Sequence, residues 1–290
     1  MLITKNIKAY KAILSDNHFE RIRYFIETEY GIKLPIEKKL MVQGRLQKRL
    51  SLLGLDNFEN YIDEVFNIEN DSIEILQMID AISTNKTSFF RELKHFEFIS
   101  NKIIPEYLQS KTDCIFRAWS AACSSGEEAY SLAMILNESF KSPTQDYRIW
   151  GSDISLKMLR LAKDAIYTET LAEEIPLNFK KKYLLKSKDK SKNLIRITEE
   201  LRQKTTFERL NLMNETYQTP YKFDLVMLRN VLIYFDRITQ NEVIRKVVDT
   251  INPGGYLILG HSESILKNEF PLEVIAPTIF KKTLKSKNYV

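Results

Sequence analysis

The chain has 290 residues, of which 44% are hydrophobic, 28% charged and 11% aromatic, and this is the composition of an ordinary globular protein. The apolar content excludes intrinsic disorder, and the low counts of eight glycines and eight prolines exclude collagen-like or linker-dominated architectures. The net charge of +5 is too small for a dedicated nucleic-acid coat, but it averages over patches: residues 33–49 hold six basic residues and one acid.

From residue 16 to 80 the apolar residues recur at helical spacing. Phe19, Ile22 and Ile26 form one such run, residues 42–53 form a second, and Gly31 and Gly54 follow the runs as stop signals. Residues 56–66 and 72–82 give two further amphipathic helices. We therefore predict an all-α N-terminal domain over residues 1–80, with a linker to about residue 110.

From residue 111 onward, short β-rich runs alternate with helical ones, and this order predicts a mainly parallel sheet with helices on both faces. The expected strands are 115–122, 147–153, 205–210, 223–228 and 256–260, with edge strands near 273–275 and 279–283, and the expected helices are 127–140, 155–165 and 238–250. The segment 252–255, NPGG, is predicted to be a turn. Residues 168–204 are too long for a plain connection and predict a small inserted β-subdomain in a domain covering 81–290.

The inventory of reactive residues narrows the chemistry. Two cysteines and three histidines cannot build a disulfide framework or a zinc site with the usual spacing, so no metal is expected. The first residues lack the apolar core of a signal peptide and no run is long enough to span a bilayer, so we expect a cytoplasmic protein with no membrane insertion.

The turn after the first expected strand, AACSSGEE at 121–128, carries a candidate ligand site. It holds one glycine, Gly126, so the GxGxxG pattern that cradles a pyrophosphate is absent and a dinucleotide enzyme is disfavoured. Glu127 and Glu128 begin the following helix, where they either suit a cationic ligand or complement the helix dipole.

Asp153 ends the second expected strand, about 25 residues later, and its carboxylate can accept hydrogen bonds from ribose hydroxyls. The alternative is that Asp153 caps the helix that begins near Ser155. A ribose site beside a cation site, without phosphate binding, is what S-adenosylmethionine requires. After the fourth strand, no Pro-Pro follows Asn230, which disfavours an exocyclic amine of a nucleic acid as methyl acceptor.

Five motifs in order resemble one known family. They are NKTSFFRE at 85–92, WSAACSSGEEAYS at 119–131, GSDI at 151–154, RNVLIYF at 229–235 and GHSES at 260–264. Together they resemble the chemotaxis receptor methyltransferases, the CheR family, over nearly the whole chain.

The resemblance implies a class I S-adenosylmethionine-dependent methyltransferase fold, a Rossmann-like doubly wound α/β sheet. It implies methyl transfer to glutamate carboxylates on the cytoplasmic helices of chemoreceptors, with S-adenosylhomocysteine as product. The positions that match the family's cofactor-contacting motifs are Asn85, Thr87, Arg91, Glu128 or its neighbour Glu127, Asp153, Asn211, Leu212, Arg229 and Asn230.

The chemistry of the acceptor agrees with this implication. A glutamate side chain, with a reference pKa of about 4.3, is ionised at neutral pH, so methyl transfer to it needs no general base. Arg91 and Tyr234 are the candidate catalytic residues, as groups that position the reactants. The alternative for Tyr234 is an aromatic side chain that packs under the end of the sheet, and a packing or hydrogen-bonding role is favoured for His261.

The basic patch offers a candidate substrate-binding surface. In a helix over 37–53, Lys38, Arg45, Lys48 and Arg49 form a stripe that either docks on an acidic receptor helix or is a solvated face. The lysine-rich insertion departs from relatives that hold a receptor peptide there with a glycine-containing loop, because residues 186–193 contain no glycine. Two other functions stay open: methyl transfer to another protein or a small molecule, and a non-catalytic module that senses the cofactor.

Overall fold

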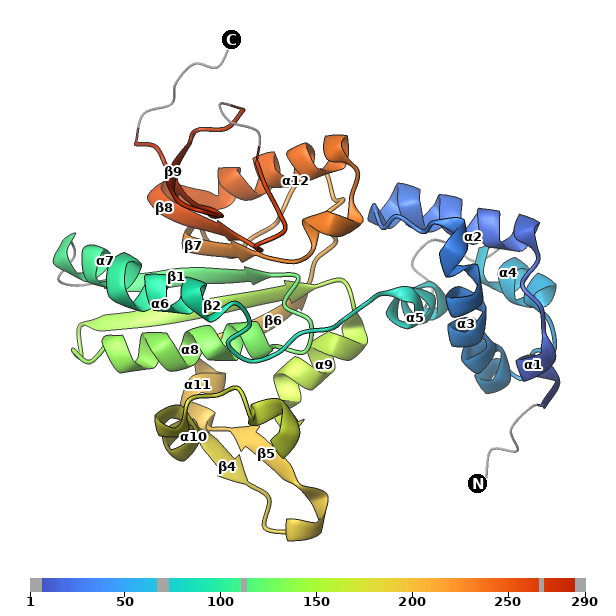
Figure 1. Ribbon diagram of the computed structural model, residues 1–290, viewed down its shortest axis with the longest axis horizontal. Coiled ribbons are helices and arrows are strands. Elements are labelled where there is room, and N and C mark those ends of the chain that lie inside the picture. Colours follow the sequence, from blue (N-terminus) through green and yellow to red (C-terminus); the bar gives the residue numbers. More distant parts are fainter. Residues whose placement is uncertain (1–6, 67–72, 111–113, 266–268, 285–290) are drawn as a thin grey trace. The chain divides into compact units, whose positions relative to one another are not determined.

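The computed structural model describes residues 7–66, 73–110, 114–265 and 269–284 (Figure 1). The chain forms two compact units, and each is described separately below. The first covers the chain up to Thr84 together with Tyr234–Asp236, and the second covers Asn85–Ile233 and the chain from Arg237 onward. Within the described residues, no helix combines the length and apolar character needed to cross a bilayer.

The first unit is helical, as predicted. Its elements are α1 (Ile7–Lys11), α2 (Asp16–Tyr30), η1 (Ile36–Lys38), α3 (Lys39–Leu53), α4 (Phe58–Phe66) and α5 (Ile73–Ile82). The predicted apolar runs bury their residues at helical spacing, as with Val42, Leu46 and Leu50 in α3. Gly31 and Gly54 end α2 and α3 in the left-handed conformation, with φ of 68° and 73°, which glycine adopts at low cost.

The stretch before the sheet is not the linker that the sequence suggested. It holds α6 (Leu93–Phe98), the π-helical η2 (Ile99–Ile103) and α7 (Ile104–Ser110). Phe89, Phe96 and Ile99 are buried in the core of the second unit. The π-helical turn interrupts the 3.6-residue period, and this explains why the sequence pattern did not show a helix here.

The second unit is built on a seven-stranded sheet in the order β6-β2-β1-β7-β8-β10-β9. Its strands are β1 (Cys114–Ala121), β2 (Gln145–Asp153), β6 (Thr205–Arg209), β7 (Phe223–Leu228), β8 (Ile251–Leu259), β9 (Leu272–Ala276) and β10 (Ile279–Lys282). The first five run parallel and the last two pair antiparallel at one edge. Each predicted strand is present, within a few residues at its ends.

Three helices connect the parallel strands: α8 (Glu127–Ser139), α9 (Leu156–Asp164) and α12 (Arg237–Thr250). The chain steps from β1 to β2 in one direction and from β7 to β8 in the other, so right-handed crossovers place α8 and α12 on opposite faces (Figure 1). Strand order therefore reverses between β1 and β7, and ligands of open α/β sheets bind beyond the carboxyl ends of the strands at such a point.

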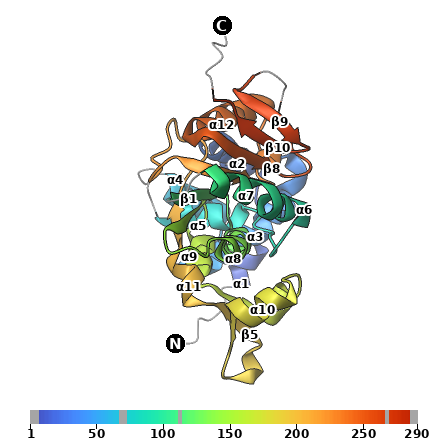
Figure 2. The same cartoon turned by 90° about the vertical axis from the view of Figure 1, so that its left-hand side faces the viewer.

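Two further features refine the prediction. The segment 252–255 is not a separate turn, because β8 begins at Ile251 and the NPGG residues are absorbed in a shift of register against β7. The predicted insertion is a three-stranded antiparallel sheet in the order β3-β5-β4. Its elements are β3 (Ile166–Thr168), η3 (Glu169–Ala172), α10 (Leu177–Tyr183), β4 (Leu184–Lys186), η4 (Lys190–Lys192) and β5 (Leu194–Ile197), followed by α11 (Glu199–Gln203). In both views α10 and β5 lie at the end of this unit away from α12 (Figures 1 and 2).

Candidate active site

The turn between β1 and α8 is held in an uncommon backbone conformation. Ala122 and Ser124 have positive φ values of 56° and 49°, and Gly126 has a φ of 94°. A Cβ on Gly126 would lie 2.9 Å from the Cβ of Ala162 in α9, so this glycine is required for close packing within the protein as well as for its φ. The small-residue turn is therefore fixed by the fold before any ligand binds.

Asp153, at the end of β2, ties this turn to the next helix. Its Oδ2 accepts from the backbone N–H of Ser124 at 2.8 Å, and its Oδ1 accepts from that of Ser155 at 2.9 Å. The cap of α9 is Ser155 itself, whose hydroxyl accepts from the N–H of Met158 at 3.1 Å. Asp153 is 6% exposed, so a buried carboxylate stands where the sequence predicted a ribose ligand.

The structure separates the two neighbouring glutamates. Glu127 is buried and accepts from the hydroxyl of Ser125 at 2.8 Å, whereas Glu128 accepts from the hydroxyl of Ser120 at 2.7 Å and pairs with Arg229. Burial raises the pKa of both carboxyl groups, and the charge of Arg229 opposes that rise for Glu128 alone. Glu128 is thus the glutamate connected to the charged network at the strand ends.

Arg229 is the centre of that network. It follows β7, and its side chain is 1% exposed. One guanidinium nitrogen donates to Oε2 of Glu128 at 2.8 Å, and another donates to Oε2 of Glu92 at 3.0 Å and to the backbone carbonyl of Arg91 at 2.5 Å. A buried cation is stable only when paired, so these contacts fix the segment before α6 against the ends of β1 and β7.

Asn230 is held by a carboxylate that the sequence did not single out. Glu263, which follows β8, is 6% exposed. Its carboxylate accepts from four backbone N–H groups at 2.7–2.9 Å: those of Asn230, Val231, Leu232 and Gly260. Asn230 has a positive φ of 58°, and its amide donates to Oε1 of Glu92 at 3.2 Å. Glu263 and Glu92 both lie in the recognised motifs, but only the structure shows what they hold.

The remaining predicted cofactor residues lie near the same strand ends. The carbonyl of Asn85 accepts from the hydroxyl of Ser124 at 3.2 Å, which joins the segment of Asn85 and Thr87 to the turn. The guanidinium of Arg91 donates to the carbonyl of Lys86 at 3.1 Å. Asn211 and Leu212 follow β6, which pairs with β2; Asn211 folds its side chain onto the N–H of Met213 at 3.0 Å, and Leu212 is buried.

The other predicted residues, Tyr234 and the basic stripe, belong to the first unit. Tyr234 ends η5 (Leu232–Tyr234), is half-buried and groups with the helical unit. Two members of the basic stripe have internal partners. Arg45 donates to the last two carbonyls of α5 at 3.2 and 2.7 Å, and Arg49 pairs with Glu74 at 2.5 Å. Of the four residues of the predicted basic stripe, this leaves Lys38, which is half-buried, and Lys48, which is exposed, as candidates for docking.

The family models give the class, an S-adenosylmethionine-dependent methyltransferase, and the seven-stranded sheet with its switch point between β1 and β7 agrees with it. The family model "CheR methyltransferase, SAM binding domain" matches residues 85–280, and "CheR methyltransferase, all-alpha domain" matches residues 17–83. The chain belongs to the CheR methyltransferase family.

Curated relatives match over most of their length. The chemotaxis protein methyltransferase of Borreliella burgdorferi is 37% identical over 274 residues, which cover 93% of this chain and 95% of that protein. The chemotaxis protein methyltransferase of Escherichia coli is 35% identical over 261 residues, which cover 89% of each chain.

The residues present fit S-adenosylmethionine. This cofactor carries a sulfonium, an α-amino group, an α-carboxylate and a ribose, and it needs both carboxylates and cationic donors. Asp153 supplies a buried carboxylate, Glu128 one whose side chain is 14% exposed, and Arg91 a guanidinium, all on segments joined to the turn at the switch point. The cofactor is S-adenosylmethionine, in agreement with the matching family domain.

The four hydrogen bonds of Glu263 generate a prediction. Glu263→Gln replaces one acceptor oxygen by an NH₂ group that faces backbone N–H donors, so we expect the second unit to lose at least about 2 kcal/mol of unfolding free energy. Both tryptophans, Trp119 and Trp150, are buried in this unit, so denaturation followed by their fluorescence reports on it alone. The exposed Glu269→Gln is the matched control and should not change the midpoint. Equal midpoints for the two variants would contradict this role of Glu263.

Proposed function

We propose that the chain transfers the methyl group of S-adenosylmethionine to glutamate carboxylates on the cytoplasmic helices of chemotaxis receptors, and that it acts in the cytoplasm. The proposal rests on membership of the CheR family together with the names of the relatives, which are chemotaxis protein methyltransferases. The structural observation that carries it is the buried network of Arg229, Glu128 and Glu92, because it builds a charged cofactor site at the switch point.

The site needs little acid–base chemistry for this reaction. An acceptor glutamate is already ionised, and His95, the buried histidine nearest the network, has a pKa lowered to about 4 by burial and by the charge of Arg229. When bound, S-adenosylmethionine supplies an activated methyl group. The tasks of the chain are to hold the acceptor oxygen in line with that methyl group and to exclude water.

Specific roles follow for the predicted residues. Asp153 binds the ribose, and Glu128, rather than Glu127, lies at the amino-acid end of the cofactor, because Glu128 is the one joined to Arg229. The guanidinium of Arg91 has further N–H donors besides the one bound to Lys86, and these suit an acceptor carboxylate. Tyr234 is proposed as a second positioning group, and the domains 1–80 and 81–290 as receptor-recognition and catalytic parts.

The assay for this function uses membranes that contain a methyl-accepting chemotaxis receptor, the protein and methyl-labelled cofactor. We expect label on the receptor as a base-labile ester that is released as methanol, and its loss when the receptor's acceptor glutamates are changed to alanine. Label that persists on the alanine receptor would show a different acceptor. Cofactor binding without any label transfer would show a non-catalytic sensing module.

A second prediction concerns the ribose. Asp153→Ala should weaken the binding of S-adenosylhomocysteine, measured by calorimetry, by at least about tenfold, because a charge-assisted hydrogen bond contributes about 1.5–3 kcal/mol. Asp146→Ala is the control: Asp146 lies at the other end of β2 and pairs with Arg148 and Lys204. Asp146→Ala should leave the affinity unchanged, and unchanged affinity in Asp153→Ala would remove the ribose assignment.

A third prediction concerns receptor docking. Charge reversal at Lys38 and Lys48 together should lower receptor methylation while the affinity for S-adenosylhomocysteine stays the same, because both residues lie in the first unit. Arg49→Glu is unsuitable for this test, because it would place a second carboxylate beside Glu74 and disrupt the packing of α3 against α5. Full methylation by the Lys38→Glu/Lys48→Glu variant would show that the stripe is a solvated face.

A further inference from the structure

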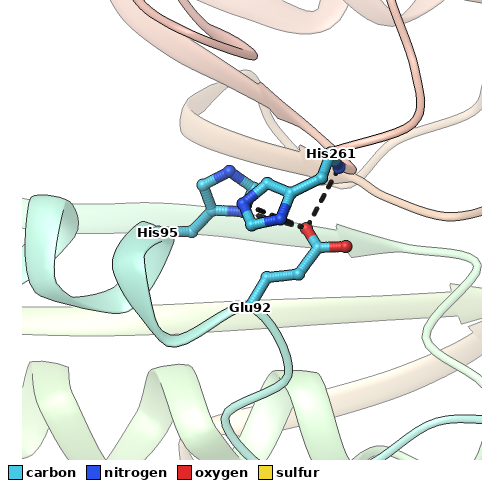
Figure 3. A group of neighbouring side chains, drawn as sticks. All are labelled: Glu92, His95 and His261. Carbon is cyan, nitrogen blue, oxygen red and sulfur yellow. Dashed lines mark hydrogen bonds and ion pairs between the residues drawn. The ribbon is translucent and has the colours of Figure 1, made fainter.

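Three side chains from two segments of the second unit converge at one point (Figure 3). Glu92 precedes α6, His95 lies within α6, and His261 follows β8. Nδ1 of His95 lies 3.4 Å from Oε2 of Glu92, and Nε2 of His261 lies 3.9 Å from the same oxygen. One ligand atom from each of the three residues lies within 4.8 Å of the other two.

The partners of His95 indicate which of its ring nitrogens carries the proton. Nε2 lies 2.9 Å from the hydroxyl oxygen of Thr278, and that hydroxyl donates its one hydrogen to the carbonyl of Pro277 at 2.7 Å. The hydroxyl oxygen therefore accepts from Nε2–H of His95. In a neutral imidazole the other nitrogen, Nδ1, then carries a bare lone pair.

That lone pair faces a carboxylate. The side chain of His95 is 3% exposed, and within the described part of the chain its Nδ1 has no hydrogen-bond partner. Glu92 pairs with Arg229 at 3.0 Å and accepts from the amide of Asn230 at 3.2 Å, so both oxygens of its carboxylate act as acceptors. Two acceptors 3.4 Å apart repel each other unless a hydrogen or a cation lies between them.

We propose that Glu92, His95 and His261 form a binding site for a divalent transition-metal ion such as zinc. Two imidazoles and one carboxylate are a common ligand set for such ions. The bond from His95 to Thr278 is the outer contact that orients a metal-ligating histidine. The sequence predicted no metal because its cysteines and histidines lack the usual spacing of zinc ligands. The proposed ligands at residues 92, 95 and 261 come from two segments far apart in the sequence and include a glutamate, so no such spacing shows them.

The distances suit such an ion. Metal–ligand bonds of about 2.1 Å place the ligand atoms of a tetrahedral site about 3.4 Å apart. The atoms of Glu92 and His95 already have this separation, whereas Nε2 of His261 must approach Oε2 of Glu92 by about half an ångström and must also close the distance to His95, which lies within 4.8 Å. The side chain of His261 is 55% exposed, so it is free to make this adjustment and leaves the site open to entry from solvent.

The charge of Arg229 does not prevent binding. Its guanidinium and the N–H of His261 both donate to the same oxygen of Glu92, at 3.0 and 3.2 Å. Arg229 also pairs with Glu128, so two carboxylates face one guanidinium. With both carboxylates ionised, the group carries one more negative than positive charge, and this lowers the repulsion between Arg229 and the ion.

The test is direct metal binding by the full chain after treatment with a chelator. We expect one equivalent of Co²⁺ to give visible absorption bands that Zn²⁺ abolishes. His261→Ala should weaken the affinity for Zn²⁺, measured by competition with a coloured chelator, by at least about tenfold. His18→Ala is the matched control, because His18 is the third histidine of the chain and lies in the first unit. It should bind Zn²⁺ as the parent does.

Three results would overturn the proposal. The first is no binding at one equivalent, and the second is equal affinity in His261→Ala and the parent. The third is intense near-ultraviolet charge-transfer absorption with Co²⁺, which would place the ion on Cys114 or Cys123 instead. Thr278→Val, which removes the contact that orients His95, provides a second variant and should also weaken Zn²⁺ binding by about tenfold.

Discussion

The site depends on one buried charge. Arg229 has almost no exposed surface, and its guanidinium is stable there only because Glu128 and Glu92 face it. Those two carboxylates come from α8 and from the segment before α6, so the ion pairs join parts of the chain that are far apart in sequence. Removing one partner of such a buried pair costs about 3–5 kcal/mol, because the other charge is left unpaired. The network therefore stabilises the second unit at the switch point of its sheet.

Glu263 is likewise a buried charged group that is stabilised by its partners, which in this case are backbone N–H groups. Four N–H groups at the ends of β7 and β8 point at one carboxylate, and Asn230 keeps its left-handed conformation among them. A Cβ on Gly260 would lie 2.9 Å from Oε2 of Glu263 and 2.6 Å from the side-chain nitrogen Nδ2 of Asn230. The glycine is thus required for the approach of two strand ends, and a short loop becomes rigid enough to present Arg229 in one orientation.

The sequence predicts what is local and periodic. The strand 223–228 is an apolar run interrupted only by Asp224 and is buried at every position, and Asp153 and Arg229 were found because the carboxyl ends of parallel strands meet at one edge. The roles of Glu263 and His95 were missed because they depend on contacts between distant parts of the chain. A carboxylate that accepts from backbone N–H groups, or a histidine that lies against a carboxylate, leaves no periodic pattern in the sequence. Arg45 and Arg49 were assigned to a free stripe because a helical pattern shows which face they share but not that Glu74 and the end of α5 cover it.

The local charges, rather than the total, decide what the site attracts. The whole chain carries a net charge of +5, yet two carboxylates face one guanidinium at the switch point, and Asp153 adds a third acid at the end of β2. In a buried environment such an excess of negative charge is unfavourable unless cations or N–H donors pair with the carboxylates. The sulfonium of the cofactor would offset it at one end under the proposed function, and a metal ion at Glu92 would offset it at the other. Because Glu92 holds Arg229 and Asn230 with its two oxygens, the charge state at Glu92 governs how firmly both residues are held.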